Sequence, residues 1–147
     1  MEIAGLLAGG RLAIDTAIFI YFIEEHPRDL ARVAPIFEAI GKGRLQATAS
    51  ALTLMETLVV PYRAGNRELA SRYERILVGG RGLRLVPVAS SVLRQAAYLR
   101  AMLRLTSPDA IHLASAVSVS ADAFLTHDRS LPQVPGLRTV LLSELVG

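Results

Sequence analysis

Four acidic residues of this chain stand in apolar or helix-starting segments, where a charged side chain needs a partner: Asp15, Glu56, Asp109 and Asp128. Burying a carboxylate without a partner costs several kcal/mol, and few basic residues flank these four positions. A divalent cation would supply the missing positive charge for all of them at once. Carboxylate oxygens are the ligands that Mg²⁺ and Mn²⁺ prefer, so the pattern indicates metal-assisted chemistry.

Each acid taken alone also has an ordinary structural explanation. Asp15 follows an apolar segment and precedes a helical one, so it is equally suited to cap that helix. Asp109 falls in the first turn after Ser107-Pro108, where a carboxylate complements the helix dipole. Asp128 closes an apolar strand and fits a turn.

Glu56 is the hardest of the four to explain as a surface residue. At helical spacing it shares a face with Leu52, Thr53, Val59 and Val60, which are mostly apolar. The alternative is an ion pair with an arginine. Three acids at strand ends or helix starts and one on an apolar helix face can converge at one edge of a parallel sheet, which favours a shared site.

Hydrophobic periodicity and turn residues predict strands that alternate with helices. The strands are expected at 11–15, 45–48, 83–88, 123–126 and 139–142, and the helices at 16–25, 30–40, 50–60, 67–78, 90–105 and from 107 onward, with a terminal helical turn at 143–146. Pro61 is expected to break or kink the third of these helices. The order predicts an α/β fold of one domain, 1–147: a three-layer sandwich with a central parallel sheet of about four to five short strands and helices on both faces.

Composition limits the function classes. The chain has no cysteine, which excludes thiolate metal sites and cysteine nucleophiles. Its formal net charge is +3, and Lys42 is the only lysine among 16 basic residues. An arginine-rich domain with an acidic cluster suits a polyanionic substrate, although a basic charge serves solubility equally well. No leader peptide and no apolar segment long enough to span a bilayer is recognisable, so a cytoplasmic protein without membrane contact is expected.

Order, spacing and local context of the acids resemble the PIN-domain ribonucleases, and among them a VapC-type toxin of a type II toxin–antitoxin system. The resemblance rests on Asp15 followed by Thr16, on Glu56 in a mid-chain helix, on the segment PDAIHLASA with Asp109, and on the Thr126-His127-Asp128 turn. It extends over essentially the whole chain, and PDAIHLASA followed by a short strand and a Thr-x-Asp turn is its most specific part.

The resemblance implies hydrolysis of RNA phosphodiester bonds with Mg²⁺ or Mn²⁺. Asp15, Asp109 and Asp128 would hold the metal, and Glu56 would contribute directly or through a water molecule. Further residues are expected around this site: Thr126 and Asp122 as possible helpers, and Arg63, Arg67 and Arg129 as possible contacts to the RNA backbone. The expected partners are the RNA substrate, a small antitoxin with a DNA-binding part, and a second copy of the chain in a homodimer.

Other interpretations remain open at this point. A PIN-like module that binds RNA or metal within an assembly, with little or no cleavage, is the main alternative. Phosphoacceptor signalling needs a lysine after a late strand, and Lys42 is not placed there. His112, one turn after Asp109, either reaches the site or is a satisfied histidine on its helix, and His127 is expected to point away from the site. The apolar helix with Phe19 and Phe22 is either buried or covered by a partner.

Overall fold

The computed structural model describes residue 5 and residues 10–145 of the chain, and these form strands and helices in alternation. The strands are β1 (Arg11–Ile14), β2 (Gln46–Ser50), β3 (Leu83–Val86), β4 (Ala123–Thr126) and β5 (Arg138–Leu141). The helices are α2 (Thr16–Ile23), α3 (Leu30–Gly41), α4 (Leu52–Arg63), α5 (Arg67–Leu77), α6 (Ser90–Met102), α7 (Ser107–Ser118) and the 3₁₀ helix η1 (Leu142–Glu144). The expected terminal turn corresponds to η1, and its last residue, Val146, lies outside the described residues.

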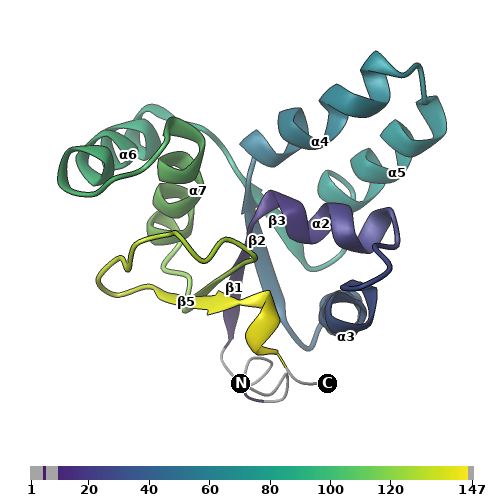
Figure 1. Cartoon of the computed structure of the whole chain (residues 1–147), viewed down its shortest axis with the longest axis horizontal. Helices are drawn as coiled ribbons and strands as arrows, with labels where there is room; N and C mark the ends of the chain where they lie inside the picture. The colour runs from purple at the N-terminus through teal and green to yellow at the C-terminus, as the bar shows by residue number, and fades with distance from the viewer. Residues whose placement is uncertain (1–4, 6–9, 146–147) are drawn as a thin grey trace.

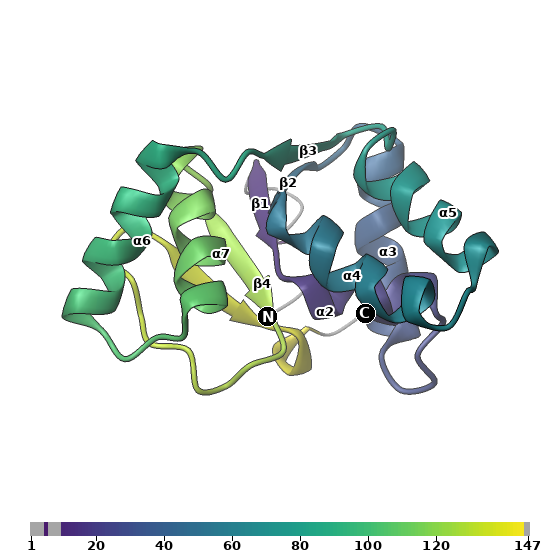
Figure 2. The ribbon, with the colours of Figure 1, turned by 90° about the horizontal axis from the view of Figure 1, so that it is seen from above.

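The five strands form one parallel sheet with the order β3-β2-β1-β4-β5. Helices α2 to α5 cover one face and α6 and α7 cover the other, as both views of the ribbon show (Figures 1 and 2). The predicted α/β sandwich is confirmed, with the larger of the two expected strand numbers. None of the described helices has the length and apolar character needed to cross a membrane.

Each face of the sheet carries its own hydrophobic core because side chains alternate along a strand. In β1, Leu12 and Ile14 pack into the core beneath α2 to α5, while Ala13 between them joins the core beneath α6 and α7. In β4, Leu125 and Phe124 divide in the same way. A strand that is buried on both faces consists of consecutive apolar residues, and β1 and β4 both contain such a run of three.

The strand order reverses direction between β1 and β4. The chain leaves β1 toward β2 and β3 on one side, then returns to place β4 and β5 on the other. The helices of these crossovers therefore diverge above the carboxyl ends of β1 and β4, the place where open α/β sheets bind ligands. Asp15 and Asp128 follow those two strand ends, and the backbone N–H of Asp15 donates to the carbonyl of Leu125 at 3.0 Å.

Pro61 was expected to break or kink its helix, and the expected break is wrong. Helix α4 continues to Arg63, with Pro61 buried inside it. Proline lacks an N–H, so one backbone hydrogen bond of the helix is missing. The pattern continues at Ala64, whose N–H donates to the carbonyl of Val60. Pro61 lies near the end of the helix and contributes apolar surface there, so the packing of α4 overrides the local signal.

Helix α7 begins at Ser107, as expected. Thr106 is its N-cap, and the hydroxyl of Thr106 accepts a hydrogen bond from the backbone N–H of Asp109 at 3.3 Å. Ser107 and Pro108 are already helical, which suits proline at this end of a helix. Asp109 consequently stands in the first turn of α7, as the sequence predicted.

Helix α2 is apolar because it is buried. Phe19 and Ile18 are fully enclosed, and Phe22 stacks on Phe37 of α3 with ring centroids 4.2 Å apart. A partner therefore has no access to Phe19, and the expectation of a partner surface on this helix is wrong there. Large exposed apolar side chains instead occur elsewhere, chiefly on α4 and α6: Met55, Val59, Val60, Tyr62, Leu93, Tyr98 and Met102.

Candidate active site

Asp15 sits at the junction between β1 and α2, with both carboxylate oxygens engaged. Oδ1 accepts from the backbone N–H of Thr16 at 2.9 Å, which caps the helix. Oδ2 accepts from the hydroxyl of Thr126 at 2.7 Å, and Thr126 is completely buried at the end of β4. The capping explanation and the placement at a strand end therefore both hold for Asp15.

Asp128 is tied to the same threonine. Its backbone N–H donates to Thr126 Oγ1 at 3.1 Å, so the hydroxyl of Thr126 links Asp15 with the turn that carries Asp128. The hydroxyl and the backbone N–H of Ser130 donate to Asp128 Oδ1, at 2.6 and 2.8 Å. These bonds hold the pKa of Asp128 below its ordinary value. The predicted role of Thr126 as a helper thus has a geometric basis.

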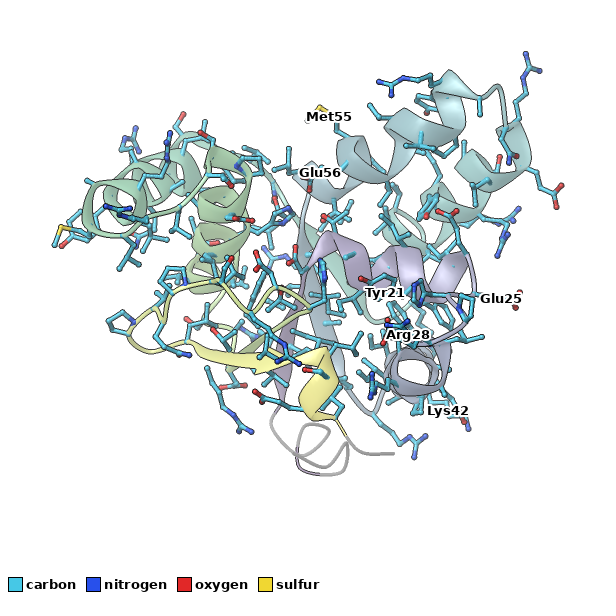
Figure 3. The ribbon with its side chains drawn as sticks, in the orientation of Figure 1. Tyr21, Glu25, Arg28, Lys42, Met55 and Glu56 are labelled. Carbon is cyan, nitrogen blue, oxygen red and sulfur yellow. The ribbon has the colours of Figure 1, made fainter. Side chains whose placement is uncertain are left out.

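Glu56 projects from α4 on the half of the helix nearest α7 (Figure 3). Its Oε1 accepts from Thr16 Oγ1 at 2.7 Å and contacts His112 Nε2 at 2.6 Å. Thr16 Oγ1 also lies 3.1 Å from the hydroxyl of Thr53, which is fully buried. Glu56 is held by side chains of α2 and α7, and the expected alternative of an arginine partner is not what the described residues show.

The surroundings of Glu56 favour its charged form. Burial alone raises the pKa of the carboxyl, but the hydrogen bonds from His112 and Thr16 and the charge of the imidazole outweigh burial. The net pKa of Glu56 is therefore lowered. A carboxylate that stays ionised and held in one orientation is suited to contact a cation or to accept a hydrogen bond from a water molecule.

Asp109 experiences the opposite balance. Burial raises the pKa of its carboxyl, and the negative charges of Asp15 and Asp128 raise it further. The hydroxyl of Thr106 and the imidazole of His112 lower the pKa, but they do not compensate, and the net pKa lies above its ordinary value. The charges of Asp15 and Asp128 therefore both oppose the ionisation of Asp109, a situation that a divalent cation relieves.

One chain of contacts passes through the segments of all four acids. It runs from the Asp128 turn through Thr126 to Asp15, from Thr16 to Glu56, and from Glu56 to His112, one turn after Asp109 on α7. Asp15, Asp109 and Asp128 form no ion pair with a basic residue in the described part of the chain. The possible metal ligands are thus carboxylate oxygens whose negative charge no basic residue neutralises, and such ligands fit a hard cation such as Mg²⁺ or Mn²⁺.

The carboxylates are not drawn together into a ready-made ligand sphere. Among residues 5 and 10–145, no three acidic or histidine side chains are close enough to hold one ion as they stand. The residues fit the cation by charge and chemistry, while the coordination itself stays a prediction.

Asp122 does not belong to this cluster. It precedes β4, whereas Asp128 follows it, and four strand residues span about 13 Å. Its Oδ2 accepts from the backbone N–H of Arg11 at 2.9 Å, at the amino end of β1. The expectation of Asp122 as a helper is therefore wrong, because the residue stabilises the opposite edge of the sheet.

The three arginines expected to contact RNA are all exposed but lie in different places. Arg63 and Arg67 flank the turn between α4 and α5, and Arg67 lines a groove of about 720 Å³ between these helices. Arg129 follows Asp128 directly, with its guanidinium 3.4 Å from Ser143 Oγ. Arg129 is thus nearest in sequence to the acids, and the role of all three stays a prediction.

His112 lies beside Glu56, as the first of the two interpretations open for it expected. It is 4% exposed and contacts Glu56 rather than serving as an ordinary helix histidine. Its position three residues after Asp109 places both side chains on one face of α7, and that spacing was the available signal. His127 is exposed and its ring packs against Tyr21 with centroids 5.7 Å apart.

Comparison with known proteins agrees with this arrangement. VapBC2 from Rickettsia felis, bound to a DNA fragment from their promoter, has the same fold, with a TM-score of 0.70 and 17% identity over 89% of this chain and 98% of that chain. A toxin–antitoxin complex from Klebsiella pneumoniae has a TM-score of 0.65 and 20% identity over 86% of this chain and 94% of that chain. Mycobacterium tuberculosis VapC20, described as a sarcin–ricin loop cleaving toxin, has a TM-score of 0.66 and 14% identity over 81% of this chain and 91% of that chain. At such identities the likeness shows a shared fold. No curated protein matches the chain.

The family itself is defined by a direct sequence match. The model of the PIN domain matches residues 12–137, a range that contains all four acids and the strands β1 to β4 except for Arg11. PIN domains are generally nucleases, and the family generally uses a divalent metal. The chain belongs to the PIN domain family.

Proposed function

We propose that this protein is a metal-dependent endoribonuclease and the toxin component of a toxin–antitoxin pair. The observation that carries the proposal is the uncompensated group of carboxylates at the point where the strand order reverses, with Asp15, Asp109 and Asp128 close enough to interact electrostatically. The fold likeness to VapC20 supports RNA as the substrate, because that protein is described as a sarcin–ricin loop cleaving toxin.

The residues divide the work of phosphodiester hydrolysis by their positions. Asp15, Asp109 and Asp128 would hold Mg²⁺ or Mn²⁺, and Glu56 would contribute directly or through a water molecule. The bound cation supplies a water of lowered pKa and offsets charge on the scissile phosphate. The backbone N–H of Thr16 and the hydroxyl of Thr126 fix the carboxylate of Asp15, so it would need little reorganisation to meet a cation.

Binding of the RNA chain calls for positive charge outside the acidic group. Arg129 stands next to Asp128, Arg67 lines the groove between α4 and α5, and Arg63 is the last residue of α4. Arginines at these positions would contact phosphates and make binding weaken with rising salt concentration. Few aromatic residues are available, so stacking on bases contributes little.

Partners follow from the same likeness. VapBC2 from Rickettsia felis was solved with promoter DNA, which supports a small antitoxin with a DNA-binding part. An arginine of the antitoxin would pair with the carboxylates and keep the cation out. A homodimer is also expected, and the exposed apolar side chains of α4 and α6 offer surface for either contact. The proposed location of the pair is the cytoplasm.

The decisive experiment is cleavage of end-labelled structured RNA by purified protein. Mg²⁺ or Mn²⁺ should be required, excess EDTA should stop cleavage, and restoring Mn²⁺ should recover it. Asp15→Asn should be inactive, while Asp122→Asn, at the opposite edge of the sheet, is the matched control and should cleave normally. Cleavage that persists in EDTA would contradict the metal mechanism. RNA binding without cleavage would support the alternative, a PIN-like binding module of an assembly.

A further inference from the structure

The imidazole of His112 is enclosed between the two layers of helices, at the side of the acidic group that faces the protein interior. It is 4% exposed, whereas the Glu56 side chain that it contacts is 29% exposed. Glu56 therefore has a closed side, occupied by His112 and Thr16, and an open side. We propose that His112 is a positioning residue, which fixes the Glu56 carboxylate for its part in RNA hydrolysis; this inference rests on the proposed nuclease function.

Counting donors assigns the direction of each bond in this network. The hydroxyl of Thr16 has one hydrogen, and it donates to Glu56 Oε1 at 2.7 Å. Thr53 must then donate to Thr16 Oγ1, 3.1 Å away. The contact of 2.6 Å between His112 Nε2 and Oε1 requires a hydrogen on Nε2, because a carboxylate only accepts. Thr16 Oγ1 lies 3.3 Å from Nε2 and is a second, weaker acceptor for the same N–H.

The rest of the imidazole has no competing role. His112 Nδ1 is buried and has no hydrogen-bond partner among the described residues. The hydrogen-bonding capacity that the ring uses is thus directed at Glu56 and Thr16. A histidine kept only for packing would be replaceable by leucine without an effect on chemistry, and burying an imidazole with one unpaired nitrogen is costly compared with an apolar side chain.

The contact also connects elements that the sheet keeps apart. Glu56 belongs to α4, which packs on one face, and His112 belongs to α7, which packs on the other (Figure 2). Asp109 lies three residues before His112, a rise of about 4.5 Å on the same helix face. The position of Glu56 relative to Asp109 is therefore set through α7. Both bonds fall on Oε1, so Oε2 is left for a cation, a water molecule or the substrate.

The test combines variants of His112 with variants of Glu56. His112→Leu should lower kcat/KM for RNA cleavage by about 10- to 100-fold, the usual effect of losing a residue that orients a ligand, mainly through kcat. His112→Gln places an amide N–H close to the position of Nε2 and should recover activity to within a few-fold of the parent. In a Glu56→Ala background, His112→Leu should add less than about a twofold loss, because it acts through Glu56.

Two further measurements separate positioning from a purely structural role. Mn²⁺ affinity from calorimetry should weaken in His112→Leu and return in His112→Gln, and this readout does not require RNA cleavage. Ser115→Ala is the control, since Ser115 is a buried polar residue of α7 that bonds only within its helix; it should change neither affinity nor activity. Thermal melting of every variant identifies those that fail to fold.

The inference is overturned if His112→Leu cleaves and binds Mn²⁺ like the parent. It is also overturned if the loss is as large in the Glu56→Ala background as in the parent, or if His112→Gln folds but recovers nothing. A parent that binds Mn²⁺ without cleaving RNA would contradict the nuclease function, and the Mn²⁺ affinities would still decide whether His112 positions Glu56.

Discussion

Glu56 and Asp109 are two half-buried carboxylates, on helices that cover opposite faces of the sheet, and their pKa values move in opposite directions. Burial raises the pKa of both. Glu56 is surrounded by donors, the imidazole of His112 and the hydroxyl of Thr16, and these more than offset burial. Asp109 instead faces two other aspartates, whose charges add to the effect of burial.

The comparison shows that similar burial does not assign similar roles to acidic residues. The carboxylate of Glu56 is satisfied by the protein itself and contributes to holding α4 and α7 together. The protein does not offset the burial and the negative charges that oppose ionisation of Asp109, and a bound cation would offset them. The strongest dependence on metal is therefore expected at Asp109, and the strongest dependence on protein neighbours at Glu56.

The largest effect should appear in catalysis. Asp109→Asn, and likewise Asp15→Asn or Asp128→Asn, should lower kcat/KM for RNA by about 10³-fold or more, roughly 4 kcal/mol of transition-state stabilisation. Glu56→Gln should cost less, because an amide keeps the shape and can still contact a water molecule. Steady-state rates of the variants, measured beside Asp122→Asn as the control, check the order. Equal losses at Glu56 and Asp109 would contradict the difference between the two carboxylates.

The next effect concerns stabilisation by metal. A cation that binds only the folded protein contributes RT ln(1 + [L]/Kd), about 2.7 kcal/mol at a hundredfold excess over Kd. For a chain of this size that corresponds to a rise in Tm of about 5–10 °C. The rise should shrink strongly in Asp109→Asn and less in Glu56→Gln. Thermal melts with Mg²⁺ and with EDTA measure it, and a parent without any metal-dependent shift would contradict a shared site.

The third effect is the loss of protein contacts around Glu56 in the absence of metal. Glu56→Ala removes the strongest acceptor of His112 Nε2 and of Thr16 Oγ1. A buried donor left without its partner costs about 1–3 kcal/mol. Urea unfolding in EDTA should show a lower free energy of unfolding by that amount. Met55→Ala, an exposed change on the same helix, is the matched control and should have little effect.

The smallest effect should have the opposite sign. Asp109→Asn in EDTA removes one of three repelling charges and should raise the free energy of unfolding by about 0.5 kcal/mol. Because the pKa of Asp109 is raised in the folded state, its charge destabilises the protein above the ordinary value of 3.8. The advantage of the variant should therefore be present at neutral pH and disappear in acid, where both states are protonated. Unfolding curves at several pH values measure this, and a variant less stable than the parent at neutral pH would contradict the repulsion.

Much of the fold follows from signals that act over a few residues. The five strands of the described chain lie where apolar runs predicted them, and α5 begins after Asn66, which caps it. Alternating strands and helices require a parallel sheet with crossovers. Because the carboxyl ends of parallel strands share one edge, the sequence alone indicates that Asp15 and Asp128 are neighbours. The family resemblance seen in PDAIHLASA agrees with the match to the PIN domain.

Tertiary structure decided the features that depend on residues far apart along the chain. The contact between Glu56 and His112 spans 56 positions, and it exists only because α4 and α7 meet above the carboxyl ends of the strands. Packing likewise retained Pro61 inside α4 and enclosed the aromatic residues of α2. Spacing along the sequence shows which side chains share one face of a helix or strand. Which other element packs against that face depends on the strand order and on the direction of the crossovers. For this reason the candidate acids were identifiable from the sequence, while the donors that hold Glu56, and the balance of burial and charge that raises the pKa of Asp109, were not.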